Sequence, residues 1–210
     1  MKKKSIALLM AAVMLMGVAI GGTIAWLKAN TNPVVNTFTV GDVNIELYES
    51  DVDDDNDNQN TTEKDDANAY QLIPGETYIK DPKVEVLGTT NVDCYLFVKF
   101  EEIGNPATYL TYETALTRDD GWTPGDGTDI PSNVWYRTVG KDDPVKSWNL
   151  LKGKTGFANG YVTIRDTVTK TNMADAAGAQ LKWTAYAVQS DNIADAATAW
   201  GIVNPAPVTP

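Results

Sequence analysis

The chain has 210 residues, with 17 Lys and Arg against 28 Asp and Glu, a formal net charge of −11, no histidine and one cysteine. The sequence therefore excludes Ser-His-Asp and Cys-His catalysis, zinc sites with imidazole ligands, and cysteine-rich metal clusters. An acidic chain repels phosphate, so nucleic-acid binding is not expected, whereas carboxylate-only catalysis and binding of hard cations remain open.

Residues 1–25 have the organisation of a secretory signal peptide. Residues 2–4 are lysines, residues 6–20 are apolar, and 21–25 are mostly small. These are the basic, apolar and cleavage regions of an export signal. We expect cleavage after Ala25, with Thr23 at the −3 position and Trp26 as the first secreted residue. Loss of three lysines would change the formal net charge to −14.

An uncleaved membrane anchor is the alternative interpretation of the N-terminus. No charged residue occurs from Ser5 to Leu27, which is long enough for a helix to cross a bilayer. A chain with a single cysteine cannot form an intramolecular disulfide, so in both cases packing must stabilise the exported protein.

The first strand pattern lies in residues 36–49, which alternate between apolar and polar residues. Phe38 and Val40 occupy even positions, whereas Val43 and the apolar residues after it occupy odd positions. A bulge or bend at Gly41 would keep both halves facing the core.

An acidic loop is expected over residues 51–66, which carry eight acidic residues, one lysine and one apolar residue. The alternative is a weak, non-selective calcium site at Asp51, Asp53, Asp55 and Asp57. An EF-hand requires Gly at its sixth position and Glu at its twelfth, and neither register of this loop supplies them.

Several further strands are expected along the chain, namely residues 71–76, 83–90, 92–103, 134–139, 145–151, 161–168 and 181–189. The strand at 92–103 is apolar on both faces, which predicts a central position. Cys94 shares one face of this strand with Val92, Leu96, Val98 and Phe100, so we expect it to pack in the core. Residues 117–133 read as a long loop, and Asn159-Gly160 as a hairpin turn.

Two short helices are expected, over residues 170–180 with Asn172 as a possible cap, and over residues 191–200. The many strands and little helix predict a mostly β fold, an antiparallel two-sheet sandwich or jelly roll with one or two short helices. The sandwich domain would span residues 41–202, followed by a Pro-rich tail at 203–210.

Residue chemistry gives two further candidates. Glu101, Glu102, Asp119 and Asp120 could supply a glycosidase pair, but no spacing selects among them, so an enzyme is not expected. Five tryptophans, at positions 122, 135, 148, 183 and 200, could include a sugar-stacking platform, although most lie in strand patterns typical of core residues. Trp122 lies in the loop GWTPGDG, and we expect it to be the ligand candidate.

The stretch 21–47 resembles the start of the TasA/camelysin (CalY) family of exported Gram-positive proteins. The matching residues are Gly21, Gly22, Thr23, Ala25, Asn36, Thr37, Phe38, Gly41, Val43 and Ile45. Residues 91–102, 162–173 and 181–200 are similar to later strands and the closing helix of such proteins. The loops at 51–66 and 117–133 match no part of the family pattern.

The resemblance implies a jelly-roll protein of the cell surface or biofilm matrix, processed by a signal peptidase of the SipW type. It also implies fibres in which residues 26–40 of one copy complete the sheet of the next, which strand-edge pairing permits. The assembly residues would be Trp26, Val34, Val35, Phe38, Val40 and Gly41. Alternatively, residues 26–40 form the first strand of their own domain.

The expected function is therefore a secreted structural subunit of extracellular fibres or surface filaments, which polymerises with itself. A monomeric adhesion module with a carbohydrate or protein ligand is the alternative. Some family members carry a metallopeptidase annotation, but this sequence has no His-Glu-x-x-His motif, so neither that activity nor a cofactor is expected.

Overall fold

A computed structural model describes residues 43–50, 72–156 and 160–204 in full, and the backbone of four short strands elsewhere. Those four strands are β1 (Lys28–Asn30), β2 (Val35–Asn36), β4 (Lys64–Asp65) and β5 (Ala69–Gln71). The remaining strands are β3 (Ile45–Ser50), β6 (Thr77–Ile79), β7 (Lys83–Val86), β8 (Cys94–Ile103), β9 (Leu110–Thr111), β10 (Thr123–Pro124), β11 (Val134–Val139), β12 (Ser147–Asn149), β13 (Tyr161–Ile164) and β14 (Gln180–Gln189). The described helices are α2 (Pro106–Tyr109), α3 (Met173–Ala177) and α4 (Ala196–Val203).

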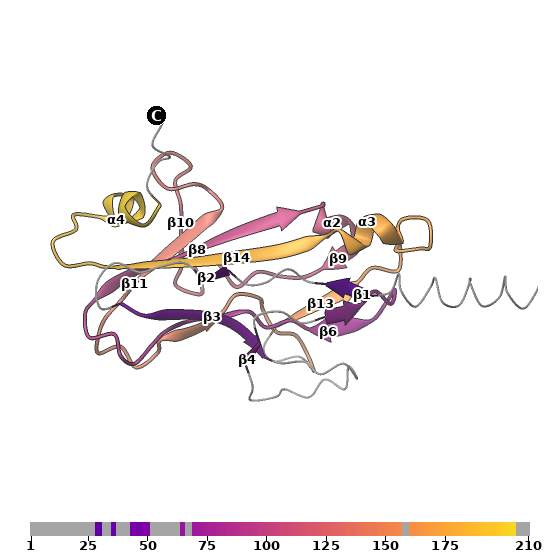
Figure 1. Ribbon diagram of the computed structural model, residues 1–210, viewed down its shortest axis with the longest axis horizontal. Coiled ribbons are helices and arrows are strands. Elements are labelled where there is room, and N and C mark those ends of the chain that lie inside the picture. Colours follow the sequence, from indigo (N-terminus) through magenta and orange to yellow (C-terminus); the bar gives the residue numbers. More distant parts are fainter. Residues whose placement is uncertain are drawn as a thin grey trace, which may run out of the picture.

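The strands form a two-layer β-sandwich, as the sequence predicts (Figure 1). One layer is a five-stranded sheet in the order β10-β11-β8-β14-β2. The facing layer contains a four-stranded sheet, β12-β7-β3-β4, and a three-stranded sheet, β6-β13-β9; β1 and β5 form a separate pair. Every described strand pair is antiparallel except β2 with β14, which is parallel. This pair departs from the expected all-antiparallel arrangement.

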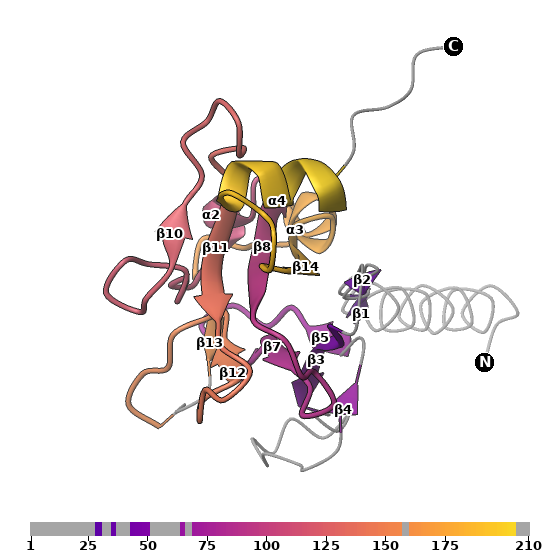
Figure 2. The same cartoon turned by 90° about the vertical axis from the view of Figure 1, so that its left-hand side faces the viewer.

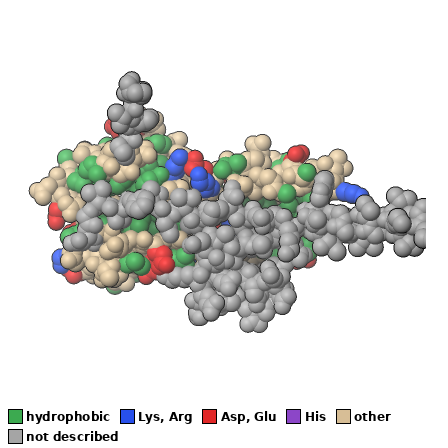
Figure 3. Space-filling view, in the orientation of Figure 1, with side chains coloured by type: hydrophobic (Ala, Val, Ile, Leu, Met, Phe, Trp, Pro, Cys, Tyr) green, Lys and Arg blue, Asp and Glu red, His purple; other side chains and the backbone are tan. Residues whose placement is uncertain are grey.

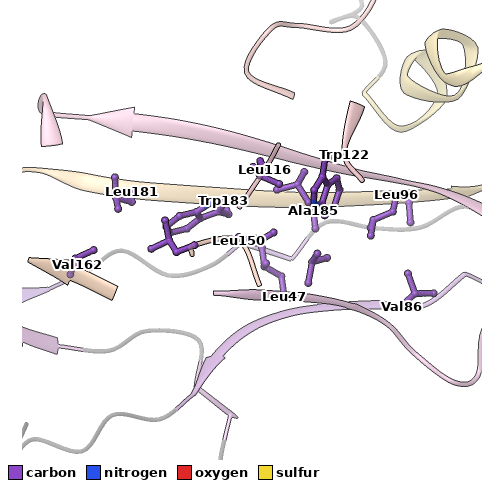
Figure 4. Close-up of a cluster of buried hydrophobic side chains, with 14 of the residues drawn as sticks. Leu47, Val86, Leu96, Leu116, Trp122, Leu150, Val162, Leu181, Trp183 and Ala185 are labelled. Atoms are coloured by element: carbon purple, nitrogen blue, oxygen red, sulfur yellow. The ribbon is translucent and has the colours of Figure 1, made fainter. Parts of the chain in front are cut away.

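The main core fills the space between the two layers. Figure 4 shows Leu47 and Val86 from the four-stranded sheet facing Leu96 and Ala185 from the five-stranded sheet. All four side chains are fully buried, or nearly so. Val43 is also buried and Ile45 packs against the same cluster, so the odd positions of this strand face the core, as predicted.

A second apolar cluster lies on the outer face of the five-stranded sheet. Helix α4 places Ala199 and Trp200 over Phe97 of β8, whose ring centroid is 5.3 Å from that of Trp200. Figure 2 shows α4 lying across the end of this sheet. Because α4 covers one face and the second layer covers the other, β8 is apolar on both faces. β8 pairs with β11 on one side and β14 on the other, which confirms its central position.

Several predicted boundaries are corrected by the structure. The predicted loop at 117–133 contains the short strand β10 and two buried residues, Trp122 and Ile130. Strand 145–151 is limited to β12, and strand 161–168 to β13. The sequence patterns missed β6, β9 and α2, which are only two to four residues long. Short elements have too few residues to establish a period.

Both predicted helices are shorter than expected. Helix α3 has five residues, and Asn172 is its N-cap residue, as expected, but its side chain makes no capping hydrogen bond. Its Oδ1 instead accepts a hydrogen bond from Thr169 N at 2.7 Å. Helix α4 begins at Ala196 rather than at 191, because Asp195 is the N-cap and accepts a hydrogen bond from Thr198 N at 2.8 Å. Asn192, before the helix, has a positive φ of 63° and belongs to a turn.

Candidate functional site

Two tryptophans and an arginine form an aromatic clamp beside β12. The guanidinium carbon of Arg137 lies 4.2 Å from the ring centroid of Trp148 and 5.1 Å from that of Trp122. The two indoles meet edge to face, with centroids 6.2 Å apart and planes at 77°. Such contacts stabilise an arginine that is partly removed from water. Burial lowers the pKa of Arg137, and its buried Nε has no hydrogen-bond acceptor among the described residues.

The local sequence explains how these three side chains meet. In β11, Trp135 and Val139 face the main core, so Arg137, which has the same parity, projects between the layers. Trp148 comes from β12, at one edge of the four-stranded sheet. Trp122 precedes β10, whose pairing with β11 holds it near Arg137. The sequence indicated none of the Arg137 contacts. The one usable signal was parity, since Arg137 alternates in phase with Trp135 and Val139.

Trp122 is not the exposed ligand platform that the sequence predicted. Only 2% of its surface is exposed, and it belongs to the main core cluster (Figure 4). The turn that carries it is compact, since Asp126 Oδ1 accepts hydrogen bonds from the amides of Thr128, Asp129 and Ile130. The half-buried indole in this region is that of Trp148.

A pocket of about 480 Å³ opens next to the aromatic clamp. Its lining combines both indoles with four polar side chains and three residues without one. The lining residues are Ala115, Asp120, Trp122, Ser147, Trp148, Asn149, Leu151, Lys152 and Gly153. Lys152 Nζ lies 3.0 Å from Glu113 Oε1 and 3.9 Å from Asp120 Oδ2. The hydrogen bond with Glu113 raises the pKa of Lys152, so its ammonium stays charged. Asp120 Oδ2 accepts a hydrogen bond from Thr117 Oγ1 at 2.5 Å.

The carboxylates proposed for glycosidase chemistry hold separate partners. Glu101 lies 2.9 Å from Lys99 Nζ and 3.7 Å from Lys182 Nζ, and the hydrogen bond with Lys99 is the main cause of its lowered pKa. Glu102 accepts a hydrogen bond from Tyr112. Asp120 instead lies at the pocket, bonded to Thr117. No described contact joins any two of these carboxylates.

A buried ionic group lies where β3 meets the chain after β6. Lys80 Nζ is 2.8 Å from Glu49 Oε1, and Lys83 Nζ is 2.8 Å from Asp81 Oδ2. Ser50 donates to Asp81 through both its amide and its hydroxyl, at 3.0 and 2.8 Å. Buried charges require such partners, because removing them from water is costly. No sequence pattern indicated this group, although the odd register of Val43 and Leu47 also places Glu49 on the core side.

Cys94 is a core residue, as predicted. It is 1% exposed and belongs to the main cluster with Leu96 and Val98. Burial raises the pKa of its thiol to about 11, so the thiolate is scarce at neutral pH.

The N-terminal segment pairs with strands of its own chain over two short ladders. β1 pairs with β5 over three residues, and β2 pairs with β14 through Val35–Thr184 and Asn36–Ala185. Among the described strands, β2 is the partner of β14 on the side away from β8, and it matches two of ten strand residues. Within a single copy, these backbone contacts correspond to the alternative in which residues 26–40 pair with their own domain.

Several expected sites lie outside the described residues. These are the cleavage residues Thr23, Ala25 and Trp26, the segment residues Val34, Phe38, Val40 and Gly41, the acidic residues Asp51, Asp53, Asp55 and Asp57, and the tail beyond 204. The end of the predicted acidic loop contributes β4, which pairs with Glu49 and Ser50. Within the described ranges, no cluster of three potential metal ligands occurs. No helix in the described part of the chain is long and apolar enough to cross a membrane.

The described surface carries both signs of charge. On the face drawn in Figure 3, acidic and basic side chains are interspersed among polar and hydrophobic ones.

Comparisons with protein-family models, curated proteins and solved structures found no match for this chain.

Proposed function

We propose that this protein is a secreted structural subunit that assembles into extracellular fibres by exchanging its N-terminal segment between copies. The observation that carries the proposal is the short parallel ladder between β2 and β14. Two residue pairs hold β2 at the sheet edge, and parallel pairs are slightly less stable than antiparallel ones. The β2–β14 ladder is therefore easily opened. β1, in the same segment, pairs with β5 over three further residues.

Exchange between copies would cost little in contact energy. When Val35 and Asn36 of a second copy pair with Thr184 and Ala185, the same backbone bonds form as within one chain. Each copy then accepts a segment at one place and donates its own at another. Such a head-to-tail contact does not close on itself unless the rotation forms a ring, so it extends into a filament.

The sequence resemblance supports the same proposal. The signal-like residues 1–25 and the motif around Phe38 and Gly41 are similar to secreted fibre-forming proteins of the TasA/camelysin type. In this proposal a signal peptidase of the SipW type cleaves after Ala25, and the protein acts in the matrix or at the cell surface. It requires no catalytic activity, metal or cofactor, and its partner is a second copy of itself.

Negative-stain microscopy and light scattering would test the proposal. Three chains are compared: residues 26–210, residues 41–210, and 26–210 with the order of residues 26–40 scrambled. The scrambled chain is the matched control, because it keeps length and composition. We expect filaments only from the intact chain, and we expect a peptide of residues 26–40 to stop their growth by occupying the acceptor edge. Monomers from all three chains, with circular dichroism confirming their fold, would disprove assembly by this segment.

A further inference from the structure

The pocket beside Trp148 has the size and lining of a small-ligand site. Its volume of about 480 Å³ is within the range of roughly 300–1,000 Å³ that is typical of ligand pockets. Its lining places Trp148 among side chains that can donate and accept hydrogen bonds, including Asp120, Asn149 and Lys152. An apolar ring surrounded by polar groups suits a ligand with one apolar face and a polar rim.

The aromatic clamp fixes the indole of Trp148 before any ligand arrives. Arg137 lies 4.2 Å from the ring centroid of Trp148, and Trp122 meets the ring edge to face. Trp122 is itself buried in the core, so it anchors the arrangement. A ring that is already held in place loses little conformational freedom on binding, which favours affinity.

The polar groups are also held in place and keep hydrogen-bonding capacity. Lys152 has three N–H donors, and Glu113 occupies one of them at 3.0 Å. Asp120 has two carboxylate oxygens, and Thr117 uses one lone pair. The side chain of Lys152 is 36% exposed and that of Asp120 is 43% exposed, so both can reach a ligand in the pocket.

The charges favour a neutral ligand. Lys152 is the cation of the lining and Asp120 its anion, and Glu113 lies beside Lys152. An anionic ligand would have to approach two carboxylates as well as a chain with a net charge of −11. A cationic ligand would meet the ammonium of Lys152 across the same pocket.

The strand edge at the pocket is too short to bind a peptide by strand addition. β12 has three residues, and the chain that follows it is already paired: Ala115 N donates to Leu150 O, and Lys152 N donates to Glu113 O. Peptide binding by strand addition depends on a longer run of main-chain hydrogen bonds.

We propose that this pocket binds one neutral saccharide unit of a glycan, with a pyranose ring against the indole of Trp148. The hydroxyl groups of the sugar exchange hydrogen bonds with Asp120, Asn149 and Lys152. This inference does not depend on fibre assembly. The pocket lies between β12 and the residue that precedes β10, and β10 is at the opposite edge of its sheet from β2, the strand proposed to exchange.

Saturation-transfer NMR on the secreted chain, residues 26–210, would test the proposal. The probes are cellotetraose, chitotetraose and mannotetraose, with tetragalacturonate as the charged comparator. We expect saturable binding of at least one neutral probe. Trp148→Leu should weaken that binding by about tenfold or more, and Lys152→Met and Asp120→Ala by about threefold each. Trp135→Leu is the matched control, since this half-buried tryptophan lies outside the pocket lining. The Trp135→Leu protein should bind the neutral probe with the affinity of the wild type.

Three results would overturn the proposal. They are the absence of transfer to all three neutral probes, tighter binding of tetragalacturonate than of any neutral probe, and equal affinity in the wild-type and pocket variants. If Trp148→Leu does not fold, the variants at the exposed residues Lys152 and Asp120 decide the outcome, because neither side chain supports the core.

Discussion

The ammonium of Lys80 lies 2.8 Å from the carboxylate of Glu49, and both side chains are almost completely buried. The same ammonium lies 5.7 Å from the ring centroid of Trp183, against the main core. We therefore expect loss of either partner to lower the stability of the fold strongly, since a buried charge without its partner is destabilising.

Replacing Lys80 with methionine should lower the free energy of unfolding by about 3–5 kcal/mol, because Glu49 loses its cation. The double variant Lys80→Met/Glu49→Leu should regain most of this loss. Urea unfolding measures both. The matched control is Lys99→Met, which breaks a pair with Glu101 that is 31% exposed on both sides and should cost less than about 1 kcal/mol. Equal losses at the two positions would contradict the role assigned to burial.

Trp122→Ala should destabilise the protein by about 3–5 kcal/mol, since a large buried side chain leaves a cavity. Val145→Ala is the control, because Val145 is 58% exposed and should change stability by less than about 0.5 kcal/mol. Urea unfolding would again be the measurement. A folded Trp122→Ala protein of unchanged stability would mean that Trp122 is not a core residue.

The thiol of Cys94 should resist alkylation in the native protein at pH 8 and react after unfolding. Its pKa of about 11 leaves roughly one thiolate in a thousand at this pH. Mass spectrometry after iodoacetamide treatment gives the result. Rapid labelling without denaturant would show that the thiol is accessible.

The raised pKa of the Cys94 thiol also predicts that the free energy of unfolding depends on pH. Its pKa is raised on folding, so the folded state keeps the proton that the unfolded state releases. This proton retention stabilises the folded state fully below about pH 9. The stabilisation is lost as pH rises towards 11, and the loss is at most about 3 kcal/mol. Across this window the free energy of unfolding of the wild type should fall relative to that of Cys94→Val, which has no thiol to titrate. A difference independent of pH would contradict the shift.

Asp195→Ala should lower the Tm at neutral pH, because helix α4 loses the side chain that caps Thr198 N. The hydrogen bond with Thr198 lowers the pKa of Asp195, so its stabilisation is present above the ordinary aspartate pKa and disappears as pH falls through the lowered value. Thermal unfolding from neutral to acidic pH should show the two Tm values converging. Asp191→Ala, in the preceding turn, is the control and should leave Tm nearly unchanged.

The sequence predicted the class of fold and its central strand well. β11 has the predicted bounds, 134–139, because alternation is clear between two turns. The apolar character of β8 on both faces indicated its central place, but α4 was needed to explain what covers the outer face. Tertiary contacts of this kind are not encoded in any local period.

The candidate site was the least predictable part of the fold. Trp122 lies among glycines, prolines and aspartates, which are typical of an exposed loop, yet the loop folds back onto β11. Within this loop the backbone at Gly125 lies against the backbone of residues 130–131. A Cβ added at Gly125 would lie 2.2 Å from Pro131 O, so the position accepts only glycine. The pairing of Glu49 with Lys80, and the placement of Arg137 between two indoles, likewise depend on segments far apart in the sequence.

The most direct test of segment exchange is a disulfide between Asn36→Cys and Ala185→Cys, which are register partners in the β2–β14 ladder. Adjacent strands bring Cα atoms within the range that a disulfide spans. Cys94 is the register partner of Gln189, four residues along β14 from Ala185, so it lies outside that range. Single-cysteine variants serve as controls. Our account predicts that oxidised filaments of this variant give covalent multimers on a denaturing, non-reducing gel. Filaments whose disulfides are all within single chains would contradict it.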